Sequence, residues 1–357
     1  MILTALFLGP LAFTNVQSSE WDWVHAHQLT LEGQGWSEVA SSFDRLPKKA
    51  EGVVRDSVWN LSRDSSGMAV RFVTDSAGIA CRWSLSKAEL AKPHMPATGV
   101  SGVDLYVRDE KGVWRWLACP LPNNQKMTAT LIKGLPPGTR EYLLYLPLYN
   151  GVQSLEVGVS VGSELKPGPM RAKEKSGPIV FYGTSITHGA CASRPGMTHP
   201  AILGRRLEYP IINLGFSGNG TMDLEIADLM VELEASVYVI DCLPNMNSKQ
   251  VSERVEPFVK RLRKFRPQTP ILLVEDRSFA NSFLQPQRQA RHAASRAALR
   301  TGLRNLIKGG TKGLYYLEGA NLVGNEDTVD SSHPSDLGFV RQADVFEPML
   351  KMILKRP

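Results

Sequence analysis

One serine and one histidine, far apart in the chain, have the residue types of a nucleophile and its general base. Ser185 lies in a Gly-Thr-Ser-Ile-Thr segment directly after the apolar run Ile179–Tyr182. A serine at such a strand-to-helix turn has backbone N–H groups nearby that favour a developing oxyanion. His333 follows Asp330 by three residues, a spacing that lets the carboxylate orient the imidazole through Nδ1 and leaves Nε2 to accept a proton. An ordinary N-cap serine and a structural histidine are the simpler alternatives.

Two further segments could supply hydrogen-bond donors to such a serine. Gly218 lies in a glycine-rich loop after the apolar run Ile211–Leu214, where the backbone can approach a ligand closely. Asn245 follows the run Val237–Asp241 and could offer its side-chain amide. A tight turn and an Asx turn are the structural alternatives for these two residues.

All of these residues follow short, nearly continuous apolar runs, which are typical of strands in a parallel sheet covered on both faces. Two more such runs, Ile271–Val274 and Leu314–Leu317, alternate with segments of helical periodicity, and a last helix is expected within Ser335–Lys355. This alternation over residues 179–357 predicts a doubly wound α/β domain. Ligands of such domains bind at the carboxyl ends of the strands, so the candidate residues are expected to share one site.

Residues 19–162 show a different pattern. Short runs rich in Val, Trp, Tyr, Phe and Leu are bounded mostly by turn residues, with no long amphipathic helix between them. The expected strands are Val53–Leu61, Met68–Thr74, Ile79–Leu85, Val103–Val107, Val113–Leu117, Met127–Leu131, Tyr142–Leu148 and Leu155–Val161. The pattern predicts a β-sandwich accessory domain. The polar, Pro- and Gly-rich residues 163–178 are expected to form a linker.

The first 18 residues are expected to be a signal peptide. An uncharged apolar start is followed by Val16-Gln17-Ser18, whose small last residue suits cleavage after Ser18. No Lys or Arg precedes the apolar stretch, and a buried first strand or a misassigned start codon is the alternative. We therefore expect a secreted or periplasmic protein. No transmembrane segment is expected, because no later run reaches about 18 apolar residues.

Composition places the chain among ordinary globular proteins. Its 357 residues, 43% hydrophobic and 21% charged, suggest about two domains and exclude a disordered or collagen-like chain. The net charge of +6 is modest, and the basic run at residues 260–266 carries apolar residues at helical spacing, so a solvated helix face is expected rather than a nucleic-acid surface. No Cys/His cluster has zinc spacing, so no metal site is expected. Free thiols are the favoured expectation for Cys81, Cys119, Cys191 and Cys242. Four cysteines also allow three full disulfide pairings, among which the sequence does not choose.

Taken together, the candidate segments resemble the four blocks of the SGNH (GDSL-type) hydrolases. The matching segments are Gly183–Thr187, Asn213–Gly218, Pro244-Asn245 and Asp330–His333. The first block departs from the family pattern, because Thr184 replaces Asp and Ile186 replaces Leu. Upstream, Thr98–Tyr106 and Leu144–Gly151 resemble the β-rich GxDLY domain that precedes one bacterial branch of this superfamily.

The resemblance implies a flavodoxin-like parallel sheet preceded by a β-sandwich. It also implies ester hydrolysis through an acyl-serine intermediate, with no metal or organic cofactor. By the same resemblance Ser185 is the nucleophile, His333 the general base and then acid, and Asp330 its orienting carboxylate. The backbone N–H groups of Ser185 and Gly218 and the side chain of Asn245 would form the oxyanion hole.

Other residues near the expected site are candidates for substrate binding. Arg194 follows the nucleophile segment and could bind a carboxylate or sulfate, and Glu275 ends the fourth strand and could bind sugar hydroxyls. A salt bridge is the alternative for each. The GxDLY-like segment and residues 149–151 carry aromatic and polar groups suited to sugars, and we expect the two domains to be in contact near the active site.

The favoured interpretation is a secreted carbohydrate O-acyl esterase acting on short acyl groups, chiefly acetyl. A lipid esterase, lysophospholipase or thioesterase on the same fold is the alternative within enzymes. A non-catalytic carbohydrate-binding protein is the alternative from another class, and the presence of Ser185, Asn245, Asp330 and His333 argues against it.

Overall fold

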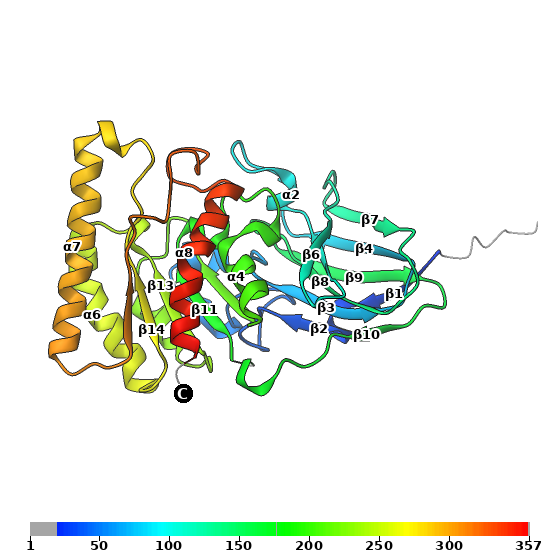
Figure 1. Ribbon diagram of the computed structural model, residues 1–357, viewed down its shortest axis with the longest axis horizontal. Helices are drawn as coiled ribbons and strands as arrows, with labels where there is room; N and C mark the ends of the chain where they lie inside the picture. The colour runs from blue at the N-terminus through cyan, green and yellow to red at the C-terminus, as the bar shows by residue number, and fades with distance from the viewer. Residues whose placement is uncertain (1–19, 176, 356–357) are drawn as a thin grey trace, which may run out of the picture.

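The computed structural model describes residues 20–175 and 177–355. A β-domain and an α/β domain lie side by side along the long axis of the molecule (Figure 1). The expected signal peptide, residues 1–18, lies outside the described residues.

Five parallel strands form the sheet of the α/β domain. They are β11 (Ile179–Gly183), β12 (Ile211–Gly215), β13 (Val237–Asp241), β14 (Ile271–Val274) and β15 (Leu314–Leu317). Their order is β12-β11-β13-β14-β15, which is the flavodoxin-like 2-1-3-4-5 arrangement. The prediction of this sheet is confirmed. The register places Gly183 beside both Gly215 and Asp241, so the first three strands end at one edge.

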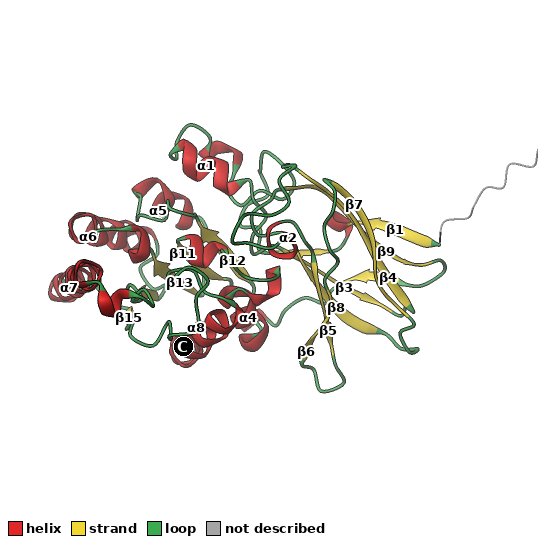
Figure 2. Ribbon diagram, turned by 90° about the horizontal axis from the view of Figure 1, so that it is seen from above, coloured by secondary structure: helices red, strands yellow, loops and turns green. Residues whose placement is uncertain are grey.

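Helices cover both faces of this sheet because each strand is apolar on both sides. One face packs on helices α5 (Leu224–Met230), α6 (Ser248–Phe265) and α7 (Pro286–Lys308). The other face packs on α4 (His199–Leu207) and α8 (Asp336–Leu354) (Figure 2). Along β11 the alternation is direct, since Val180 and Tyr182 belong to the first core and Ile179 and Phe181 to the second.

The β-domain is built from two antiparallel sheets that enclose a third core, which confirms the predicted sandwich. The first sheet has the order β1-β9-β4-β7, and its strands are β1 (Trp21–His25), β9 (Val152–Ser160), β4 (Gly78–Leu85) and β7 (Lys126–Lys133). The second has the order β10-β3-β8-β5-β6, with β2 also paired to β3. Its strands are β10 (Leu165–Pro167), β3 (Ala69–Thr74), β8 (Arg140–Tyr145), β5 (Asp104–Arg108), β6 (Trp114–Ala118) and β2 (Thr30–Glu32).

Short helical turns lie between these elements. The α-helical ones are α1 (Asp56–Ser62), α2 (Ala97–Val100) and α3 (Ser185–His188). The 3-10 turns are η1 (Ala26–Gln28), η2 (Lys48–Ala50), η3 (Lys173–Lys175), η4 (Pro195–Met197), η5 (Leu243–Asn245) and η6 (Ser282–Leu284).

Two predictions about the first half of the chain were wrong in part. The run Val53–Leu61, predicted as a strand, contains helix α1. Its buried side chains Val54, Val58 and Trp59 recur at helical spacing and pack against the α/β domain core, not inside the sandwich. The predicted linker contains β10, whose Leu165 pairs with Thr74 of β3.

All four cysteines are free thiols, as expected. The basic run lies at the end of α6 and on the residue after it, where Lys260 pairs with Glu256 and Arg261 with Asp228. Across residues 20–175 and 177–355, no helix combines the length and the hydropathy needed to cross a membrane.

Candidate active site

Ser185 is the first residue of α3, directly beyond the end of β11. Thr184 caps this short helix, and its side chain accepts a hydrogen bond from the Ile186 backbone N–H. Gly183 has no room for a side chain, because a Cβ there would lie 2.1 Å from Thr187 Oγ1. Ser185 is recessed, with 8% of the residue exposed.

His333 and Asp330 come from the loop before α8 and meet Ser185 at the carboxyl edge of the sheet. Ser185 Oγ lies 2.8 Å from His333 Nε2, and His333 Nδ1 lies 2.7 Å from Asp330 Oδ2. The other carboxylate oxygen of Asp330 accepts from the backbone N–H groups of His333 and Ser332, at 2.8 and 3.1 Å. The sequence-predicted serine, histidine and aspartate therefore form one continuous hydrogen-bonded relay.

The carboxyl of Asp330 is held in its ionised form. Its partial burial opposes ionisation, but the hydrogen bonds from His333 and Ser332 together outweigh that effect and lower the pKa of Asp330 below its ordinary value. An ionised carboxylate at Nδ1 fixes the imidazole with Nε2 directed at the serine, and it favours an imidazolium if one forms.

The loop after β12, which carries Gly218, packs on the last residue of β11. Gly218 has a positive φ of 69°, and a Cβ added there would meet open space. The same loop packs tightly on β11, since a Cβ at Gly220 would lie 1.9 Å from the Gly183 carbonyl oxygen. Glycine at these two positions lets the loop turn sharply and approach the backbone of Gly183.

Asn245 lies in η5, just beyond β13, and reaches the same loop. In the amide orientation that satisfies both its polar atoms, Oδ1 accepts from the backbone N–H groups of Asn219 and Gly220, at 3.0 and 3.1 Å. The carbonyl side of the amide is thus anchored to the loop, which leaves the NH₂ group as a donor on the opposite side. The three predicted donor segments accordingly gather at one edge of the sheet.

The β-domain contacts the nucleophile helix through Tyr149. The Tyr149 hydroxyl donates to the Ser185 carbonyl oxygen at 3.3 Å, and the Tyr149 ring stacks on the His188 ring. The expected contact between the domains near the site is confirmed. The expected sugar-binding role of residues 149–151 is wrong, because Tyr149 is 5% exposed and Asn150 is fully buried.

The GxDLY-like segment holds the loop that follows α3. Asp104 accepts from the Gly196 N–H and from Arg194, both at 2.8 Å, and Arg194 also donates to the Tyr106 hydroxyl at 2.6 Å. Gly99 in α2 packs on the same loop, since a Cβ there would lie 2.2 Å from the Ala192 carbonyl oxygen. These contacts correct the expectation for Arg194, whose guanidinium is engaged in an interdomain ion pair instead of being free for substrate.

Glu275 is also placed differently from the prediction. Its side chain is 2% exposed, and its carboxylate pairs with Arg300 at 2.6 Å, accepts from the Gly319 N–H at 3.0 Å and binds the Tyr316 hydroxyl. A carboxylate enclosed in this way cannot reach a sugar hydroxyl. The ion-pair alternative is the one that the structure supports.

The buried Arg45 stabilises the end of β12, where the family segment Asn213–Gly218 begins. Arg45 donates to the carbonyl oxygens of Asn213 and Gly215, at 3.1 and 2.6 Å, and to that of Asp64 at 2.8 Å. Burial lowers the pKa of Arg45 to about 10, which still leaves it charged at neutral pH. Burial, helped by the charge of Arg45, also holds the pKa of His188 well below its ordinary value, so this imidazole is neutral beneath the site.

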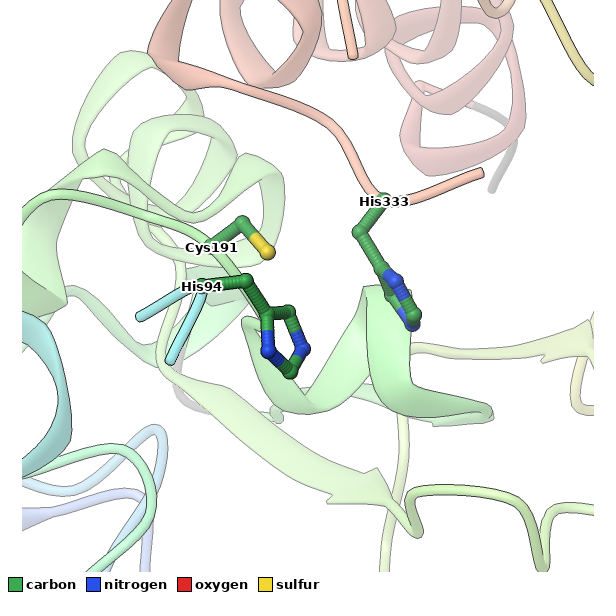
Figure 3. Close-up of side chains that lie close together, drawn as sticks. All are labelled: His94, Cys191 and His333. Carbon is green, nitrogen blue, oxygen red and sulfur yellow. The ribbon is translucent and has the colours of Figure 1, made fainter. Parts of the chain in front are cut away.

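Two neighbours of His333 were not assigned a role from the sequence. His94 of the β-domain and Cys191 of the loop after α3 lie next to it (Figure 3). Burial, with a smaller contribution from Asp330, raises the pKa of the Cys191 thiol to about 12, so it is protonated at neutral pH. No spacing pattern could have revealed this cluster, because its members are about 100 and 140 residues apart in the chain.

Comparison with known proteins identifies both halves of the chain. Residues 176–351 match the model of the GDSL-like lipase/acylhydrolase family, and residues 21–165 match that of the N-terminal domain of SGNH-hydrolase-type esterases, GxDLY. The search of curated proteins found no matching relative.

Solved structures are similar over nearly the whole chain. A GDSL-like lipase from Bacteroides ovatus is 32% identical, with a TM-score of 0.88 over 94% of this chain and 98% of that one. A salicylyl-acyltransferase of a tetracycline biosynthetic pathway is 20% identical, with a TM-score of 0.74 over 96% of this chain and 99% of that one. A family two carbohydrate esterase from Clostridium thermocellum, solved with cellohexaose, is 16% identical, with a TM-score of 0.61 over 81% and 93%.

The last two likenesses show the fold alone, whereas the family match and the Bacteroides structure, at 32% identity, show the family. The serine, histidine and aspartate of the matching sequence segments are linked by hydrogen bonds. The three donor segments lie at the same edge of the sheet. On these findings the chain belongs to the GDSL-like lipase/acylhydrolase family of SGNH hydrolases and carries the GxDLY domain at its N-terminal side.

Proposed function

We propose that this protein is a serine esterase that removes short acyl groups, chiefly acetyl, from carbohydrate. The observation that carries the proposal is the relay from Ser185 through His333 to Asp330, with contacts of 2.8 and 2.7 Å. Membership of an acylhydrolase family supports ester hydrolysis. The carbohydrate part is supported by the distant likeness to a carbohydrate esterase that was solved with cellohexaose.

In the first step Ser185 Oγ attacks the acyl carbon while its proton passes to His333 Nε2. The π electrons of the carbonyl move onto its oxygen, and Asp330 stabilises the imidazolium that results. The oxyanion receives hydrogen bonds from the backbone N–H groups of Ser185 and Gly218 and from Asn245 Nδ2. These donors are fixed before the reaction begins, so they cost little reorganisation when the charge develops.

In the second step the oxyanion collapses and the bond between the acyl carbon and the alcohol oxygen breaks, which completes the acylation of Ser185. His333 returns its proton to that oxygen, which leaves as a sugar hydroxyl, and the acyl group stays on Ser185. Water then attacks the acyl-serine, gives one proton to His333 and forms a second oxyanion. Collapse of that oxyanion releases the carboxylic acid, and His333 reprotonates Ser185.

The preference for a small acyl group is supported by the surroundings of the nucleophile. Ser185 is 8% exposed, and Ala190, Cys191 and Ala192 of the loop after α3 are buried, with the Ala190 N–H donating to the Ser185 carbonyl oxygen. An acetyl group fits beside a recessed serine with less rearrangement than a long chain requires. The expected secretion of the protein would place it among extracellular glycans.

Two measurements on the purified chain test the proposal. With p-nitrophenyl esters from acetate to dodecanoate, kcat/KM is expected to fall steeply as the acyl chain lengthens. With a panel of acetylated oligosaccharides and polysaccharides, free acetate is expected, and Ser185→Ala is expected to release none. A maximum at octanoate or beyond would support the lipid esterase alternative. Transfer of acetyl to an acceptor sugar, without release of acetate, would show an acyltransferase instead.

A further inference from the structure

Three side chains with metal-ligating atoms converge beside the reacting serine. His94, Cys191 and His333 each offer one such atom, and these atoms all lie within 4.8 Å of one another. Figure 3 shows them drawn together from three separate segments of the chain. His94 is exposed, and the His333 side chain is 23% exposed, so the cluster is open to solvent on one side. Cys191, which is 6% exposed, lies on the buried side of the cluster.

The backbone around His94 and Cys191 and the side chain of His333 are constrained by the fold. His94 lies in a turn whose ends are joined by two backbone hydrogen bonds of 3.0 Å between Lys92 and Met95. Cys191 has a φ of +71°, a left-handed conformation that is uncommon for a residue other than glycine and that marks a constrained backbone. His333 is fixed by Asp330 at Nδ1.

One thiol and two imidazoles form a donor set that suits zinc and similar dications. Three protein ligands would leave a fourth tetrahedral position for water. The three donor atoms would have to approach one another by about 1 Å to bind one ion. Small side-chain rotations can supply this movement. Asp330 already stands where a carboxylate supports a metal-bound histidine through its second nitrogen.

Both nitrogens of His333 have partners in the relay. Nδ1 is bound by Asp330 and Nε2 faces Ser185 Oγ at 2.8 Å, so a cation on either nitrogen would displace one of these partners. A cation on Nε2 would occupy the lone pair that has to accept the serine proton. Binding would also release the thiol proton of Cys191 to solvent, because the thiolate is the ligand form.

We propose that His94, Cys191 and His333 form a binding site for a zinc-class dication, and that this ion reversibly inhibits the enzyme. The inhibition rests on the proposed esterase function, whereas the binding does not. His94 comes from the β-domain and Cys191 and His333 from the α/β domain, so the ion would join the two domains across the active site.

The first test measures inhibition of the metal-free full chain by Zn²⁺, with p-nitrophenyl acetate as substrate. Inhibition is expected to be reversed by a chelator. In Cys191→Ser and in His94→Gln, the Zn²⁺ concentration for half-inhibition is expected to rise more than roughly tenfold. The matched control is Cys119→Ser, which removes a thiol outside the cluster and is expected to leave the inhibition unchanged. Equal inhibition of the wild type and both cluster variants would overturn the proposal.

The second test detects binding without any need for activity. Co²⁺ added to the Ser185→Ala protein is expected to give a thiolate-to-cobalt charge-transfer absorption, and adding Cys191→Ser is expected to abolish it. Absence of this band in Ser185→Ala would refute the metal site even if the esterase function holds. If the chain hydrolyses no ester, the band still decides the binding. Should Cys191→Ser fail to fold, the exposed His94→Gln, with folding checked by circular dichroism, decides through a weakened cobalt affinity.

Discussion

The ring of Tyr149 lies parallel to the ring of His188, with centroids 4.0 Å apart and planes 10° from parallel. Tyr149 belongs to the β-domain and His188 is the last residue of α3, the helix that begins with the nucleophile. The imidazole of His188 is also held at Nε2, 2.7 Å from the Leu148 carbonyl oxygen. One face of the nucleophile helix is therefore part of the domain interface.

Replacement of Tyr149 by Phe is expected to slow catalysis modestly. The change keeps the stacked ring and removes the hydroxyl that donates to the Ser185 carbonyl oxygen. Loss of one such hydrogen bond corresponds to roughly a two- to tenfold fall in kcat, with KM nearly unchanged. Steady-state kinetics on p-nitrophenyl acetate measures the effect. The control is Tyr145→Phe, which removes a buried tyrosine hydroxyl bonded to Ala201, away from the serine. An equal loss in both variants would argue against a positioning role for Tyr149.

Ser185→Ala and His333→Ala are each expected to remove nearly all turnover, and the double variant is expected to be little worse than either. Groups that act as one unit fail together, because the relay needs both the attacking oxygen and its proton acceptor. Turnover of the three proteins, compared at equal folded concentration, gives the result. Ser84→Ala, on strand β4 of the β-domain, serves as the control. Wild-type turnover by Ser185→Ala would show that another residue is the nucleophile.

Asn245→Ala is expected to lower kcat by roughly 10²–10³ with little change in KM, the usual loss for one side-chain donor to an oxyanion. Asn245→Asp separates two explanations. It keeps an oxygen that can accept from the Asn219 and Gly220 N–H groups, but it loses the NH₂ donor and adds a negative charge. The Asp variant is therefore expected to be at least as impaired as the Ala variant. If it retains most of the activity, Asn245 acts by anchoring the loop.

Asp330→Asn is expected to reduce turnover less than His333→Ala, because the amide oxygen can replace one of the two carboxylate oxygens, either the one beside Nδ1 or the one that accepts from the backbone N–H groups. The same change gives a pH-dependent effect on stability. The folded pKa of Asp330 is depressed, so its ionisation stabilises the fold above the unfolded pKa, and this contribution is lost as the pH falls through the folded pKa. The gap in Tm between wild type and Asp330→Asn should shrink as the pH is lowered from about 7 toward about 3. A gap independent of pH would contradict this assignment.

The α/β domain was predicted more accurately than the β-domain, for a physical reason. Each strand of the parallel sheet is a continuous apolar run, and the chemistry follows directly at its end, so Ser185, Gly218 and Asn245 could be placed from local sequence. In the β-domain, local composition conflicts with tertiary context. The run Val53–Leu61 is rich in β-branched and aromatic residues, yet it includes a helix because its apolar side chains face the neighbouring domain.

The misassigned site residues share one cause. Arg194 was placed correctly in the segment after the nucleophile and Glu275 at the end of the fourth strand, but the partner that each charge finds could not be predicted from its neighbours in the sequence. Asp104 and Arg300 are those partners, and neither is close in sequence to the residue that it pairs with. His94 was missed for the same reason, since only the packing of the two domains brings it to His333.

The close approach of Gly99 to the Ala192 carbonyl oxygen restricts how this architecture can diversify. A side chain at residue 99 would displace the segment that connects the nucleophile helix to α4, and that segment is also held by Asp104 through the Gly196 N–H. The β-domain thus fixes the conformation of residues 192–196, and we expect that it cannot be exchanged on its own. Chimeras that exchange residues 20–165 between distant relatives should preserve activity only when residues 192–196 are exchanged with them, so the two halves are expected to evolve as one inherited unit.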